Sequence, residues 1–163
     1  MVPEIQFPLA VAYADKLAIT LQHWLPWLTN IDGNVLYLHP VFVNFVAAAV
    51  PISVIFDIAG RIFGRDTLRT VAAWNMVVAA CAIPFTVFFG WLFWGGQSDD
   101  DWQMAVHFWL GNAFLFILIF MAVWRWRIYA KGRPPGAVYL GIAVLVLAVL
   151  IIQAHLGGMH SFS

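Results

Sequence analysis

The residues of this chain best suited to chemistry are its histidines, because a neutral imidazole is a common nitrogen ligand of haem iron, zinc and copper. His107 begins an apolar run, and Gly111 follows four residues later on the same helical face. His39 begins another apolar run, and His155 is followed within three residues by two glycines. A bis-histidine haem needs two rings facing each other from different helices, with small residues beside them. The sequence therefore predicts b-type haem or another metal bound by His107 with His155 or His39, and Gly111 beside it.

Each of these residues also has a structural interpretation. A histidine near a membrane interface often serves as an amphipathic anchor, which is how we interpret the remaining two, His23 and His160. The three candidate ligands can instead cap a helix start or form hydrogen bonds within a helical bundle. Gly111 can allow two helices to pack closely, without any cofactor.

The composition is that of an integral membrane protein. Hydrophobic residues make up 63% of the 163 residues and charged residues only 10%, whereas a soluble domain carries about a quarter charged residues. Four apolar runs have about the length that crosses a bilayer; they are residues 41–58, 71–94, 104–124 and 137–153. We therefore expect an all-α membrane protein, with a four-transmembrane-helix bundle at residues 39–163. The formal net charge of zero gives no basic surface for nucleic acid.

Residues 1–38 are less hydrophobic and form a separate region. Apolar residues from Val11 to Leu28 recur in steps of three and four, while Asp15 and Lys16 fall away from that stripe. Each of those two charges would cost about 2.5–3.5 kcal/mol near the centre of a membrane span. The pattern predicts an amphipathic interfacial helix, followed by a turn-rich joint, rather than a fifth span.

The positive charges predict the orientation. Most of the eight lysines and arginines fall in two connections on one side of the bundle: Arg61, Arg65, Arg69, Arg125, Arg127, Lys131 and Arg133. The positive-inside rule makes that side cytoplasmic. All five histidines then lie towards the other side. We expect a multi-pass protein of the bacterial inner membrane with both termini in the periplasm.

Three smaller expectations concern single features. Asp57 should pair with Arg61, four residues further on, with a proton relay as the alternative. Cys81, the single cysteine, should be a small buried residue that takes part in no disulfide framework. Spans one and two form a helical hairpin, as do spans three and four, but the sequence shows no convincing repeat between them.

A short segment resembles a known family. The run Leu38-His39-Pro40-Val41-Phe42-Val43-Asn44-Phe45 is similar to the HPxxVHFPIAL signature of an uncharacterised bacterial family of four-span membrane proteins. That family also tends to carry a histidine at the start of span three and an H-x-G-G segment after span four, which His107 and His155-Leu156-Gly157-Gly158 match. Asn44 stands where the family has its second histidine, so any ligand role of that residue is lost here. The family is often linked with cytochrome-containing respiratory modules, and the resemblance implies a redox role.

Two functional hypotheses follow. In the first, the chain is a membrane subunit of a respiratory or photosynthetic electron-transfer complex that binds haem or another metal near the periplasmic face. Its partners would be lipid, other membrane subunits, a quinone and a periplasmic electron carrier. In the second, it is a cofactor-free accessory subunit that stabilises a larger membrane complex. A stand-alone enzyme is not expected, because the sequence has no Ser/His/Asp order and no glycine-rich phosphate loop.

Overall fold

Four long helices make up the part of the chain that the structure describes. The computed structural model describes the backbone of residues 38–94 and 102–161, so the predicted interfacial helix and joint at residues 1–38 lie almost wholly outside it. The helices are α3 (Leu38–Ile62), α4 (Asp66–Trp94), α5 (Trp102–Ala130) and α6 (Ala137–Ser161). All four are long and apolar enough to cross a membrane, and the described residues contain no strand. The predicted fold class, an all-α four-helix bundle, is confirmed.

The helices extend further than the apolar runs that predicted them. The helix α5 has 29 residues and is therefore about 44 Å long, longer than the roughly 30 Å hydrocarbon core of a bilayer. The additional turns hold polar and aromatic residues that suit the headgroup layers. Pro51 and Pro84 are accommodated inside α3 and α4, as is common in membrane-spanning helices.

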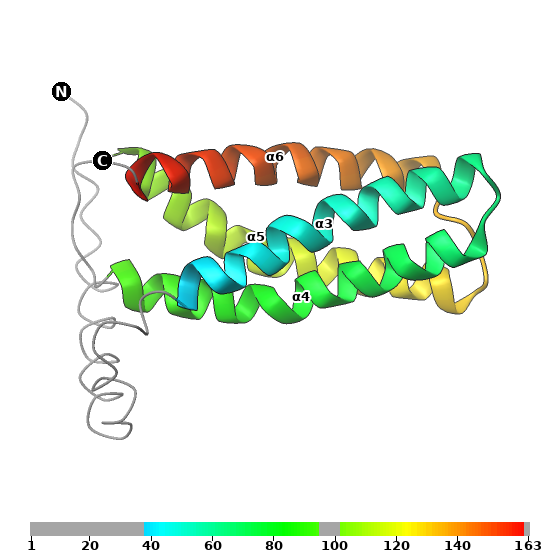
Figure 1. Cartoon of the computed structure of the whole chain (residues 1–163), viewed down its shortest axis with the longest axis horizontal. Helices are drawn as coiled ribbons and strands as arrows, with labels where there is room; N and C mark the ends of the chain where they lie inside the picture. The colour runs from blue at the N-terminus through cyan, green and yellow to red at the C-terminus, as the bar shows by residue number, and fades with distance from the viewer. Residues whose placement is uncertain (1–37, 95–101, 162–163) are drawn as a thin grey trace, which may run out of the picture.

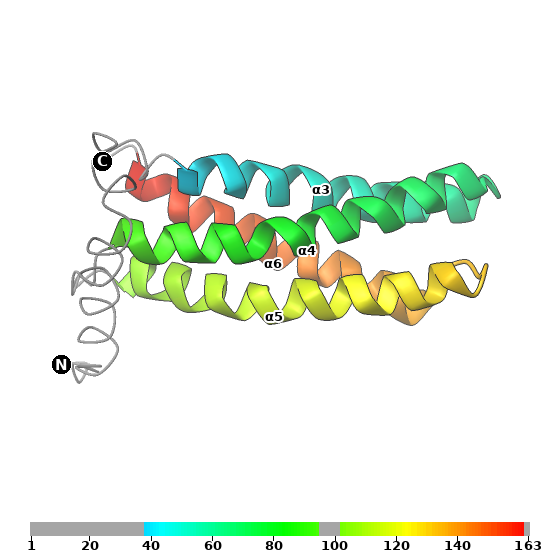
Figure 2. The ribbon, with the colours of Figure 1, turned by 90° about the horizontal axis from the view of Figure 1, so that it is seen from below.

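The helices run alternately up and down between two ends of the bundle (Figures 1 and 2). We call the end with His39, His107 and His155 the histidine end. The opposite end, where α3 turns into α4 and α5 into α6, is the arginine end. Both turns there contain a glycine with positive φ, Gly64 at 63° and Gly132 at 61°, a conformation that glycine adopts without strain.

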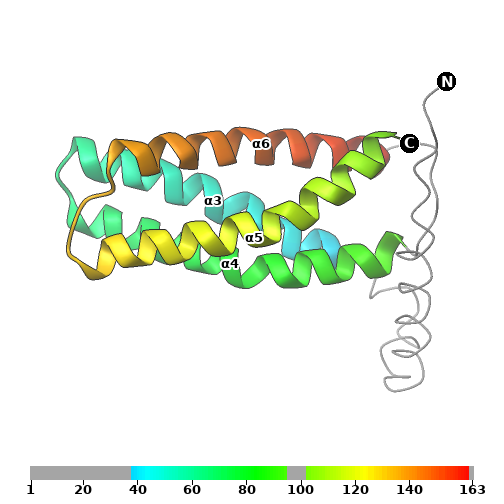
Figure 3. The ribbon, with the colours of Figure 1, turned by 180° about the vertical axis from the view of Figure 1, so that it is seen from behind.

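The helix order around the bundle is α3, α4, α5, α6, so that α3 and α5 lie diagonally opposite each other. In Figure 1 α3 passes in front of α5, and in Figure 3, the view from behind, α5 passes in front of α3. The closest packing joins α3 to α4. Small buried residues allow this approach: Ala49, Ser53, Ala72, Ala73 and Ala79. The Ser53 hydroxyl donates across this contact to the Ala72 carbonyl at 2.9 Å.

Candidate functional site

His107 is held at the start of α5 by contacts with α6. Its Nδ1 lies 3.0 Å from the carbonyl oxygen of Gln153, which can only accept, so Nδ1 carries the proton. The Gln153 side-chain Nε2 donates back to the His107 carbonyl at 2.8 Å. The half-buried ring lies directly against Gly157, where an added Cβ would stand 2.5 Å from the ring carbon Cε1. Only glycine at position 157 leaves room for this imidazole.

His39 is held at the start of α3 in the same manner by α4. Its Nδ1 lies 2.8 Å from the Thr86 carbonyl oxygen, and its half-buried ring lies against Gly90, where a Cβ would stand 3.0 Å from Cε1. In both places the carbonyl comes one helical turn before the glycine. The two histidines therefore occupy matching environments, one in each hairpin.

This arrangement selects the nitrogen that could bind a metal. A proton on Nδ1, donated to a backbone carbonyl, leaves the lone pair on Nε2. The same hydrogen bond is the usual outer-shell contact of a metal-bound histidine, because it fixes the tautomer and the ring orientation. The Nε2 atoms of His39 and His107, on different helices at one end of the bundle, are therefore the candidate metal-binding atoms.

A haem needs fewer protein ligands than a simple metal ion does. A structural zinc site needs four protein ligands and a catalytic one needs three. Within residues 38–94 and 102–161, no group of three or more His, Cys, Asp or Glu side chains could hold an ion. Haem supplies four nitrogens of its own and needs one or two axial ligands from the protein. His39 and His107 equal that number of ligands and come from two different helices.

The other predicted site residues lie elsewhere. His155 is exposed, and because it is two residues from both Gln153 and Gly157, it projects from nearly the opposite face of α6. The side chains of His23 and His160 are outside the described part of the chain. Gly111 faces the Gln153 amide, which would lie 3.3 Å from an added Cβ. The absence of a side chain at position 111 leaves room for the Gln153 side chain, which holds His107.

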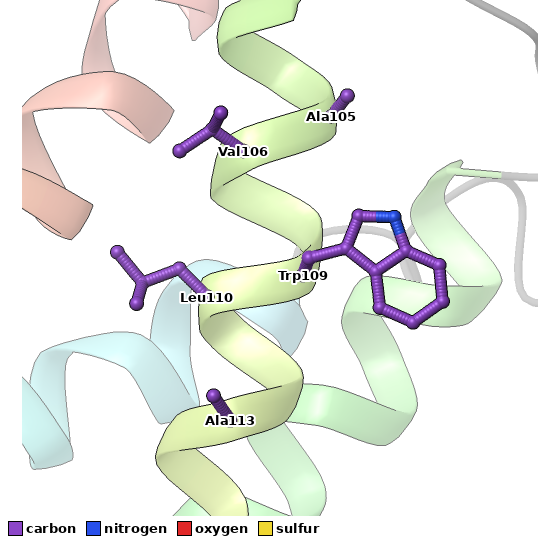
Figure 4. Close-up of a pocket in the computed structure, with 5 residues that line it drawn as sticks. All are labelled: Ala105, Val106, Trp109, Leu110 and Ala113. Carbon is purple, nitrogen blue, oxygen red and sulfur yellow. The ribbon is translucent and has the colours of Figure 1, made fainter. Parts of the chain in front are cut away.

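Aromatic residues join α4 to α5 beside the histidines. The Trp91 Nε1 donates to the Asn112 Oδ1 at 3.0 Å, and the Trp91 ring meets the Phe108 ring edge-on at 4.7 Å. A shallow apolar groove of about 400 Å³ follows the outer half of α5 and is lined by Ala105, Val106, Trp109, Leu110 and Ala113. Val106 and Leu110 point to one side of the helix and Trp109 to the other (Figure 4).

Near the arginine end, the structure contains a buried ion pair that the sequence analysis missed. Asp57 of α3 accepts from Arg125 of α5 at both oxygens, 2.8 Å from Nε and 2.7 Å from Nη2. Both side chains are 1% exposed. Arg125 Nη2 also donates to the Arg69 carbonyl at 2.7 Å.

The expected pairing of Asp57 with Arg61 is therefore wrong. Arg61 donates instead to the Pro135 carbonyl at 2.7 Å and so ties the two turns of the arginine end together. Arg125, expected in a connection, lies inside α5, where a carboxylate on the diagonal helix compensates its charge. A local spacing rule selects the nearest arginine and cannot find a partner on another helix.

The fold and these polar contacts define a multi-pass membrane protein with a compact helical bundle. A family model described as "Predicted membrane protein (DUF2231)" matches residues 36–163. The chain belongs to this family of predicted membrane proteins. Neither a curated protein nor a solved structure matches the chain.

Proposed function

We propose that the protein is a membrane subunit of an electron-transfer complex and that it binds a b-type haem between His39 and His107. The observation that supports this is the matched pair of imidazoles at one end of the bundle. Each has Nδ1 engaged by a carbonyl of the neighbouring helix and its lone pair on Nε2. A haem held there would supply one-electron chemistry at its iron.

The residues around the histidines would orient and shield such a group. The carbonyls of Thr86 and Gln153 hold the two rings in place, and Gly90 and Gly157 let the rings lie against the helices. Trp91 and Phe108 close the space between α4 and α5 with apolar surface, which reduces contact of the site with water. The apolar groove on α5 is suited to an isoprenoid chain, as a quinone partner would present.

The proposed location follows from the charges. Arg61, Arg65, Arg127, Lys131 and Arg133 cluster at the arginine end, which the positive-inside rule assigns to the cytoplasm of a bacterial inner membrane. The histidine end would then face the periplasm, within reach of other membrane subunits and of a periplasmic electron carrier.

A second candidate function is that of a cofactor-free accessory subunit. The contacts that favour it are the reciprocal hydrogen bonds between His107 and Gln153, which join α5 to α6 without any ligand. In that case both histidines fasten their hairpins at the membrane surface, and the lipid-facing side chains pack against neighbouring subunits.

Optical spectroscopy of the purified full-length protein distinguishes the two. For a haem subunit we expect a Soret band that shifts on reduction. His39→Ala and His107→Ala should each remove most of the bound haem, while His155→Ala, at an exposed position of α6, should retain it. A colourless, metal-free protein expressed with ample haem would overturn the haem proposal. Full haem content in His107→Ala would overturn the ligand assignment.

A further inference from the structure

The two hairpins of the bundle correspond position by position. His107 and Arg125 of α5 each lie 68 positions after His39 and Asp57 of α3. The same offset relates Gly132 to Gly64, the two turn glycines with positive φ. It also relates every buried residue of α5 to a buried residue of α3: Phe114, Leu118, Met121, Ala122 and Arg125 correspond to Val46, Val50, Ser53, Val54 and Asp57.

The second helices of the hairpins correspond with an offset of 67. Five buried residues of α6, Tyr139, Ala143, Val146, Leu150 and Gln153, fall on five buried residues of α4, Ala72, Met76, Ala79, Ile83 and Thr86. The carbonyls that hold the two histidines, at Thr86 and Gln153, are one of these pairs, and the glycines beneath the two rings, Gly90 and Gly157, have the same offset. The sequence shows no repeat because the paired residues share their position and burial but seldom their identity.

We infer that the chain consists of two equivalent hairpins that pair about a two-fold axis along the bundle, and that Asp57 and Arg125 determine this pairing. Because α3 and α5 run in the same direction and lie diagonally opposite, the axis passes between them. Asp57 and Arg125 occupy equivalent positions and meet across it, with 1% exposure each. Parallel repeats related by such an axis are one of the known architectures of membrane proteins.

The charges explain why each hairpin pairs with the other and not with a copy of itself. If two α3–α4 hairpins paired in the same way, Asp57 would meet a second Asp57. If two α5–α6 hairpins did so, Arg125 would meet a second Arg125. Either contact would bury like charges, which is strongly unfavourable. The surface that each hairpin presents to the axis thus fits the other hairpin of the same chain.

The two hairpins differ in how closely their helices pack, and the residues explain this difference. The contact of α3 with α4 is much closer than that of α5 with α6. At equivalent buried positions the first hairpin has Ser53 and Ala72, whereas the second has Met121 and Tyr139. Larger side chains hold α5 and α6 further apart, while the register of the buried positions is retained.

The oligomeric state of charge variants tests the inference. The double variant Asp57→Leu with Arg125→Leu removes the charges that select the other hairpin over a copy of the same hairpin. It should still fold, because apolar pairs commonly replace buried ion pairs without loss of stability. We expect this double variant to fold and to show, besides the wild-type species, one of twice the wild-type protein mass, formed by exchange of hairpins between chains. Asp57→Arg with Arg125→Asp restores opposite charges and should keep the wild-type mass. Mass would be measured by light scattering in detergent and by cross-linking in membranes.

The controls separate this role from that of an ordinary ion pair. Asp66→Asn removes an exposed pair with Arg69 inside one helix and should leave the mass unchanged. A leucine double variant that folds with the wild-type mass alone would overturn the inference that the charges select the pairing. Should the leucine variant fail to fold, the charge-swapped variant decides: wild-type mass and yield support the equivalence of positions 57 and 125, and loss of folded protein contradicts it. None of these results depends on bound haem.

Discussion

The side chains of His39 and His107 owe their orientation to backbone atoms of a neighbouring helix. The carbonyl oxygens of Thr86 and Gln153 lie within helices. Each can accept a second hydrogen bond, here from the imidazole of a neighbouring helix. The glycine one turn further on then decides whether the ring fits. Each of these two histidines is thus placed by a carbonyl and a glycine of the neighbouring helix. The role of the glycine can be tested directly.

Gly157→Ala should displace the His107 ring, because the new methyl group would lie 2.5 Å from ring carbon Cε1. We expect a loss of about 1–3 kcal/mol in the free energy of unfolding, the usual cost of overpacking, and a lower haem content if haem is bound. Gly158→Ala is the matched control, since nothing lies within 4 Å of its added Cβ. Equal stability of the two variants in detergent unfolding would show that the ring does not depend on Gly157.

The buried ion pair makes a second prediction at this scale. Asp57→Asn leaves the Arg125 charge uncompensated in the bundle interior, where both side chains are 1% exposed. We expect the free energy of unfolding to fall by about 3–5 kcal/mol. Asp66→Asn removes an exposed carboxylate, 89% accessible, from its pair with Arg69 and should cost less than about 1 kcal/mol. Similar unfolding curves for the two variants would contradict the structural importance of the buried pair.

Among the elements, the two turns at the arginine end differ in length but share a glycine with positive φ. Each hairpin reverses through a glycine in the left-handed region, and Arg61, at the end of α3, donates to the Pro135 carbonyl in the second turn. This hydrogen bond connects the first hairpin to the turn of the second. Because the hairpins are equivalent, substitutions at equivalent turn positions should have equivalent effects.

Gly64→Ala and Gly132→Ala should each lower the free energy of unfolding by about 1–2 kcal/mol, because the left-handed conformation is strained for any residue with a Cβ. No atom lies within 4 Å of the added Cβ at either position, so the backbone alone accounts for the effect. Gly141→Ala, inside α6 and likewise without a neighbour, should be neutral or stabilising by up to about 1 kcal/mol. A cost at only one of the two turns would show that the hairpins are not equivalent.

Hydropathy and turn residues were sufficient to predict the four helices, but not which of their faces lies inside the bundle. In a membrane both the core and the lipid favour apolar side chains, so Phe114, 1% exposed, and Phe116, 72% exposed, look alike in the sequence. For the same reason the prediction that Cys81 is buried is wrong, since the structure has it exposed. His39 and His107 could be proposed from residue type, whereas Gln153 and Arg125 depend on contacts between helices distant in sequence.

In the whole molecule, two polar sites lie near opposite ends of the proposed two-fold axis: the two histidines and the buried ion pair. The histidine end carries one histidine from each hairpin, His39 and His107, each held by a carbonyl of its own hairpin; the proposed haem would be bound in the same way by both. The arginine end brings together two opposite charges, which suits a permanent contact. Between them lie the apolar residues of the core, including Val50, Leu118 and Ile83. The proposed haem site and the proposed pairing contact therefore lie near opposite ends of the same bundle.

The last prediction concerns which end of the bundle faces the cytoplasm. The positive-inside rule predicts that the cationic residues gathered at the arginine end stay on the cytoplasmic side during insertion. In a Cys81→Ser background, we expect a membrane-impermeant maleimide to label Ser98→Cys, in the segment that joins α4 to α5, in intact spheroplasts. Arg65→Cys and Arg133→Cys, in the two turns of the other end, should react only after permeabilisation. The reverse pattern would place the histidines at the cytoplasmic face, where a periplasmic electron carrier could not reach them.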